Sequence, residues 1–118
     1  MPTSERSRFS AFDVVVVPFP YADRLAEKRR PALVISGARL APTGLIWVAM
    51  ITSADNEHRP LDVPIPDLER AGLPAPSVVR PAKIACIEAV RVDRRAGHLD
   101  KATARTVAQR LRSLLGSP

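Results

Sequence analysis

KRRPALVIS, residues 28–36, is the stretch on which both the fold and the candidate site depend. Three cations end against Pro31, whose ring fixes its own φ angle and favours an extended backbone at Arg30. The apolar run that follows predicts a buried strand that starts near Pro31 and runs to Ile35 or Ser36. Two interpretations are open from these residues alone. Either Arg30 is held at the mouth of a strand, where it can bind a phosphate in one geometry, or the three charges belong to a solvated loop.

Apolar stretches on either side predict a small β-sheet. Four consecutive valines are β-branched and suit a pleated, buried surface, so the first strand is expected over residues 13–17, ended by Pro18 and Pro20. The run 45–51 is apolar throughout and predicts a central strand. The other expected elements are a frayed N-terminus over 1–10, a charged loop over 21–29, a short strand over 61–65, one helical turn over 66–72 closed by Gly72, two strand pieces over 77–80 and 83–87 broken at Pro81, and an edge strand over 90–95.

The C-terminal segment predicts one amphipathic helix over residues 100–115. Asp100 is a good N-cap and Gly116 marks the end of the helix. One helical face is apolar and consists of Ala104, Val107, Ala108, Leu111, Leu114 and Leu115. Five or six short strands followed by one helix predict a mainly β (α+β) fold, in which the helix packs on a strongly bent sheet. We expect a single domain over residues 1–118.

The charge balance indicates the kind of partner. The chain has 118 residues, with 18 Lys and Arg against 12 Asp and Glu, which leaves a formal net charge of +6. A basic excess on so small a domain favours a polyanion or an acidic protein as partner. Arginine dominates the basic set, and its planar guanidinium suits bidentate phosphate contacts.

The scarcity of cysteine and histidine narrows the chemistry. A lone Cys86 cannot form an intrachain disulfide and suits a reducing cytosol, and two distant histidines make a metal site unexpected. We therefore expect no metal and no cofactor. No apolar run approaches the ~20 residues of a membrane span and no signal peptide is visible, so a cytoplasmic protein is expected. Cys86, Trp47 and Phe19 are expected to lie in the core.

Four motifs in order resemble the MazF/PemK toxins of bacterial toxin–antitoxin systems. They are FDVVVVPFP at residues 12–20, KRRPALVIS at 28–36, ITS at 51–53 and SVVRPAKI at 77–84, followed by the C-terminal helix. The resemblance implies an SH3-like small barrel of five to seven short strands, a homodimer, an acidic antitoxin as partner, and a metal-independent endoribonuclease that cuts single-stranded RNA. The chain departs from the family at Phe12-Asp13, where the family often has Gly-Asp, and in the loop between the first two strands, which lacks glycine.

The resemblance assigns two catalytic residues, Arg30 and Thr52. In such a reaction the ribose 2′-OH attacks the adjacent phosphorus and leaves a 2′,3′-cyclic phosphate and a 5′-OH. Arg30 can donate two charge-assisted hydrogen bonds to the phosphorane oxygens, and Thr52 can add a neutral donor. Thr52 also has a purely structural interpretation, as a strand-end residue that bonds its own turn.

Other polar residues are candidates for holding RNA: Lys28, Arg29, Ser53, His58, Arg80 and Lys83. Arg80 and Lys83 either flank the RNA groove or lie at the dimer interface. An arginine is a poor general base near pH 7, so another group is needed for proton transfer. His58 is the histidine nearest the site in sequence, Asp55 and Glu57 are alternatives, and the sequence does not identify the group.

Two other functions fit the same residues. One is a non-enzymatic toxin of the same fold that acts on a protein target, like the gyrase-poisoning CcdB relatives. The other is a small basic nucleic-acid-binding module, which binds with a steep salt dependence and leaves its ligand intact.

Overall fold

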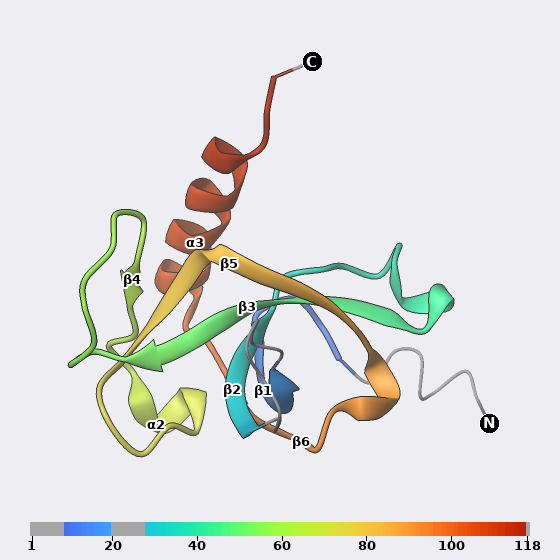
Figure 1. Ribbon diagram of the computed structural model, residues 1–118, viewed down its shortest axis with the longest axis horizontal. Coiled ribbons are helices and arrows are strands. Elements are labelled where there is room, and N and C mark those ends of the chain that lie inside the picture. The colour runs from blue at the N-terminus through green and yellow to red at the C-terminus, as the bar shows by residue number, and fades with distance from the viewer. Residues whose placement is uncertain (1–8, 20–27, 118) are drawn as a thin grey trace.

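The computed structural model describes residues 9–19 and 28–117 of the chain. Six antiparallel strands form one curled sheet in the order β4-β5-β3-β2-β1-β6, and a C-terminal helix packs against it (Figure 1). This arrangement confirms the expected small barrel-like sheet with a terminal helix. The elements are β1 Asp13–Phe19, β2 Lys28–Val34, the 3-10 turn η1 Ala41–Thr43, β3 Leu45–Ser53, β4 Val63–Pro64, α2 Leu68–Ala71, β5 Ser77–Glu88, the 3-10 turn η2 Ala89–Arg91, β6 Arg94–His98 and α3 Lys101–Leu114.

The sheet buries apolar side chains on both of its faces. The first cluster lies between the sheet and the helices and includes Val14, Leu33, Ala49, Ile51 and Val107. The second cluster covers the opposite face and includes Val15, Val17, Ala32, Val34, Ile46 and Val48. Because side chains alternate along a strand, the valine run contributes to both clusters, which explains why it is continuous rather than alternating with polar residues.

The first two strands are longer than expected. β1 continues through Pro18 to Phe19, so Pro18 does not end the strand. Pro18 opposes Arg29 of β2. On its other side β1 pairs with β6 only as far as Val16 and Arg94. A proline can occupy that position because no strand pairs with β1 on its other side there. β2 starts at Lys28, three residues before the expected start, so all three cations lie on the strand itself. The expected loop over 21–29 otherwise falls on residues 20–27, outside the described residues.

β5 is one strand of 12 residues rather than two pieces broken at Pro81. Ala49 opposes Ile84 and the next residue, Met50, opposes Arg80, so residues 81–83 have no counterparts on β3. Such a bulge accommodates a residue without an N–H while pairing continues on both sides. The side chain of Pro81 is fully buried and lies within this bulge.

The remaining helices and strands lie close to the expected residue ranges, with shifts of a few residues. The expected strand over 90–95 is instead the turn η2 followed by β6, which pairs with the outer edge of β1. The strand expected over 61–65 is reduced to Val63–Pro64. The helical turn α2 ends at Gly72 as expected, and Asp100 caps α3 through a 3.1 Å hydrogen bond from the Thr103 N–H.

Several expected core residues lie at the surface. Trp47 is 47% exposed and Cys86 is exposed, because both point away from the second cluster at the end of the sheet that α3 does not fully cover. Leu114 and Leu115 are exposed as well, since the last turn of α3 extends past the sheet. The side chain of Phe19 lies outside the described part of the structure.

The last two residues of the N-terminal segment that was expected to be frayed, Phe9 and Ser10, make contacts with the fold. Residues 1–8 lie outside the described residues, but Phe9 packs against the second cluster and the Ser10 N–H donates to Asp13 Oδ2 at 2.9 Å. Phe12 has a φ angle of 74°, in the left-handed region that favours glycine. This backbone gives a physical reason for the glycine that the family often has at this position. Among the described helices, none is long and apolar enough to cross a membrane.

Candidate active site

Arg30 and Thr52 lie at facing positions of two adjacent strands. The β2–β3 pairing runs through Val34–Val48, Leu33–Ala49 and Ala32–Met50, and the same register continued by two residues brings Arg30 opposite Thr52. Both residues fall on the face of the second cluster, because each lies two positions beyond a residue that packs there.

A hollow of about 250 Å³ opens at this end of the sheet, and we call it the Arg30 hollow. One wall comes from β2 and β3 and the opposite wall from residues 73–77, with Asn56 at the rim. The strand wall consists of Arg30, Pro31, Met50, Ile51, Thr52 and Ser53. The structure therefore brings together three of the expected site residues. The Nε atom of Arg30 is buried, which places the base of its guanidinium in the wall rather than in solvent.

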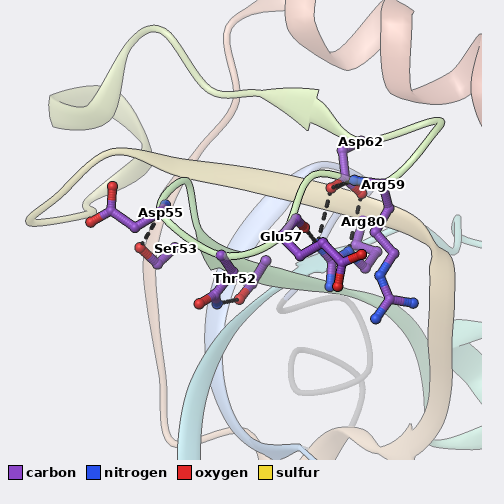
Figure 2. Close-up of polar contacts among 8 residues, drawn as sticks. Thr52, Ser53, Asp55, Glu57, Arg59, Asp62 and Arg80 are labelled. Atoms are coloured by element: carbon purple, nitrogen blue, oxygen red, sulfur yellow. Dashed lines mark hydrogen bonds and ion pairs between the residues drawn. The ribbon is translucent and has the colours of Figure 1, made fainter.

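The turn after β3 holds the Thr52 hydroxyl. The Asn56 side-chain amide donates to Thr52 Oγ1 at 2.6 Å, and the Asp55 N–H donates to Ser53 Oγ at 3.1 Å (Figure 2). Thr52 thus bonds its own turn, as the structural interpretation expected. A hydroxyl that accepts one hydrogen bond retains its own proton, so Thr52 can still donate to a phosphate oxygen in the hollow.

The opposite wall is positioned by close packing of α2 on β6. Gly72 ends α2 with a φ angle of 72°, and a Cβ atom built there would lie 2.1 Å from the Ala96 carbonyl oxygen. A Cβ atom on Gly97 would lie 2.2 Å from the Arg70 carbonyl oxygen. Only glycine fits either position, and the chain that leaves Gly72 goes on to form the wall over residues 73–77.

Arg80 is bound to Asp62 and to the loop that precedes β4. Its Nε donates to Asp62 Oδ1 at 3.1 Å, its Nη2 to Asp62 Oδ2 at 3.0 Å, and the same Nη2 to the Glu57 carbonyl oxygen at 2.9 Å (Figure 2). The Asp62 side chain is 1% exposed and that of Arg80 12%. Burial disfavours the Asp62 carboxylate, but the hydrogen bonds from Arg80 and from the Arg59 N–H outweigh it and hold its pKa below the ordinary value. The bond to Asp62 likewise raises the pKa of Arg80.

The other expected site residues lie around the Arg30 hollow rather than in it. Arg80 and Lys83 line a neighbouring hollow of about 230 Å³. Strand alternation places Lys28 on the same face as Arg30 and Arg29 on the opposite face, and both are exposed. His58 is exposed in the loop that follows Asn56 and does not line the Arg30 hollow.

The described part of the Arg30 hollow contains one ionisable side chain, Arg30. Its residues can therefore bind and stabilise negative charge, while Asp55, Glu57 and His58 stand outside it. No group of three or more potential metal ligands occurs among residues 9–19 and 28–117. Sequence reasoning missed Asn56 and Asp62. The polar cluster at 52–56 could have indicated Asn56, whereas Asp62 and Arg80 are 18 residues apart and no local pattern links them.

A small curled sheet with one helix packed against it is a fold found in a known class of toxin. The family model of PemK-like, MazF-like toxins of type II toxin–antitoxin systems matches residues 10–115, and the chain belongs to this family. A search of curated proteins with the sequence finds no match.

Solved structures support the same assignment. MazF from Deinococcus radiodurans is 28% identical, with a TM-score of 0.73 over 92% of this chain and 97% of that one. A MazE–MazF structure from the same organism is 25% identical, with a TM-score of 0.70 over 93% and 97% of the two chains. An endoribonuclease in complex with its cognate antitoxin from a mycobacterial species is 16% identical, with a TM-score of 0.71 over 93% and 95%, and shows a shared fold.

Proposed function

We propose that this toxin is an endoribonuclease that cleaves single-stranded RNA at the Arg30 hollow. The observation that carries the proposal is the facing placement of Arg30 and Thr52 on adjacent strands, in one hollow that can admit a phosphodiester. A mycobacterial endoribonuclease that was solved with its cognate antitoxin has the same fold.

The reaction uses the RNA's own nucleophile. The ribose 2′-oxygen gives its proton to water and bonds to phosphorus, and the bond from phosphorus to the 5′-oxygen breaks as that oxygen takes a proton from water. The products are a 2′,3′-cyclic phosphate and a 5′-OH. Arg30 donates to the non-bridging oxygens as negative charge builds on them, and Thr52 adds a neutral donor from the other strand. These described residues act by charge stabilisation and positioning.

We further propose that the toxin acts as a homodimer and is blocked by an acidic antitoxin. The MazE–MazF structure supports an antitoxin partner, and the net charge of +6 favours an acidic one. An exposed apolar surface made by Trp47, Ile84 and Leu114 surrounds a hollow of about 360 Å³ and supports a self-association face. Sedimentation equilibrium of the wild-type chain and of Trp47→Glu tests this self-association face. If the substitution does not weaken the dimer, the dimer uses another surface.

The activity is tested by incubating purified toxin with a long RNA in chelator and comparing single-residue variants. Arg30→Ala should lower the single-turnover rate about 100- to 1,000-fold, as removal of a transition-state donor does elsewhere, and Thr52→Ala should lower it by a smaller factor. Mass spectrometry of the fragments should find 2′,3′-cyclic phosphate ends.

Arg105→Ala is the matched control, because Arg105 is an exposed arginine on α3 that does not line the hollow, and α3 packs on the first cluster. Undiminished cleavage by Arg30→Ala rejects the proposed mechanism. If RNA binds and stays intact, the chain is a binding module, and if replication stops before translation, a protein target is favoured.

A further inference from the structure

A second hollow adjoins the Arg30 hollow and shares Met50 with it. It is lined by Met50, Arg59, Arg80, Ala82 and Lys83, has a volume of about 230 Å³, and is called here the Arg59 hollow. Met50 opposes Arg80 in the β3–β5 pairing and lies two residues before Thr52 on the same face of the sheet. The two hollows therefore open side by side on one face.

The Arg59 hollow is lined by three cations and by no carboxylate among the described residues. The charge of Arg80 is balanced by Asp62, which takes two of its N–H donors behind the hollow. Arg80 thus forms a fixed wall of the hollow, and Arg59 and Lys83 bring the two positive charges that Asp62 does not balance.

Arg59 is held by the same carboxylate through its backbone. The Arg59 N–H donates to Asp62 Oδ2 at 3.1 Å, and the Asp62 N–H donates to the Arg59 carbonyl oxygen at 3.2 Å. Leu61 completes this tight turn in the left-handed region, with a φ angle of 79°. Figure 2 shows the Arg59 side chain extending away from the Asp62 carboxylate, so the turn fixes its backbone while its side chain lines the Arg59 hollow.

We propose that the Arg59 hollow is a second phosphate subsite, which binds the RNA phosphate next to the one that is cleaved. Arg59 and Lys83 contact this phosphate, and the Arg80–Asp62 pair is a positioning element that holds Arg59 in place. The inference rests on the proposed function, because the neighbouring Arg30 hollow must hold the scissile phosphate. Arginine's planar donors suit a phosphodiester, and a shared Met50 wall gives the chain of nucleotides an apolar surface between the two charges.

The test compares a dinucleotide, which carries only the scissile phosphate, with a longer oligonucleotide of the same cleavage sequence that adds flanking phosphates. Arg59→Gln should raise KM for the longer RNA about tenfold more than it raises KM for the dinucleotide, because it removes charge-assisted hydrogen bonds to the flanking phosphate. Arg59→Lys, which retains the charge, should recover part of the loss. Arg105→Gln removes the same charge from a remote surface and is the control.

A binding measurement separates this inference from the cleavage proposal. An oligonucleotide with a 2′-deoxy sugar at the cleavage position cannot be cut, so its affinity reports the subsite even if the chain proves inactive on RNA. Arg59→Gln should reduce the slope of log affinity against log salt by about 1 relative to Arg105→Gln. Equal affinities and slopes for the two variants, or equal losses on the dinucleotide and the longer RNA, overturn the proposal.

Discussion

Arg30 on β2 and Thr52 on β3 face each other two residues beyond the last paired residues of their strands, Ala32 and Met50. The paired part of the two strands ends at Ala32 and Met50, and both Arg30 and Thr52 line the Arg30 hollow. If both bind one phosphate, their contributions to the reaction depend on each other.

A double-mutant cycle tests this dependence. We expect the rate loss of Arg30→Ala/Thr52→Ala to be smaller than the product of the two single losses, because a phosphate released by one residue is no longer held for the other. The measurement is the single-turnover rate on one RNA at saturating enzyme. Strictly multiplicative losses would show that the two residues act on different groups.

The alternation of side chains along β2 makes a second prediction. Lys28 shares the face of Arg30, whereas Arg29 lies on the opposite face. Lys28→Gln should therefore raise KM for RNA more than Arg29→Gln does, although both remove one charge from neighbouring positions. Steady-state kinetics on the same oligonucleotide measure the two KM values. A larger increase of KM for Arg29→Gln would mean that RNA runs along the other side of the sheet.

The existence of most elements followed from local patterns. The valine run, the apolar stretch at 45–51 and the helix after Asp100 each have a composition that favours one structure, and their order matched a known family. Arg30 and Thr52 were paired by that resemblance, and the sheet register then placed them face to face.

The features that the sequence did not predict depend on contacts between residues that are distant in the chain. Pro81 was expected to break β5, but an irregular register opposite Ala49 and Met50 absorbs it. Trp47 is hydrophobic yet exposed, and nothing in its strand distinguishes it from buried neighbours. The Arg80–Asp62 pair joins residues 18 positions apart, so Arg80 looked like one more cation for RNA when it is largely committed to a carboxylate.

The Asp62 carboxylate predicts a specific dependence of stability on pH. Its folded pKa lies below its unfolded value, so it stabilises the fold above about pH 4, and that stability is lost as the pH falls through the folded pKa. At neutral pH, Asp62→Asn should lower the free energy of unfolding by about 3 kcal/mol, because it leaves the charge of the partly buried Arg80 unbalanced. Urea titrations at a series of pH values measure both effects.

The acid limb is the informative part of that experiment. Wild type should lose stability on acidification below about pH 4 more steeply than Asp62→Asn, since the variant has no carboxylate to protonate. Asp100→Asn is a useful comparison, because its pKa is also lowered, by the hydrogen bonds from Thr103, and Asp100 lines neither hollow. Parallel acid limbs for wild type and Asp62→Asn would contradict the assigned role.

Gly72 predicts a link between the packing of α2 and the shape of the active site. Gly72→Ala must adopt a φ angle of 72° and also place a methyl group 2.1 Å from the Ala96 carbonyl oxygen, so α2 must shift from β6 and carry the wall of the Arg30 hollow with it.

Gly44→Ala is a matched control, because Gly44 has a φ angle of 82° but nothing within 4 Å of an added Cβ. Gly44→Ala should cost about 1 kcal/mol for the backbone alone and leave cleavage intact. Gly72→Ala should cost at least about 2 kcal/mol more and slow RNA cleavage, measured by denaturant unfolding and single-turnover kinetics. Equal destabilisation by the two substitutions would mean that α2 and β6 are free to separate, and that the wall is positioned by other contacts.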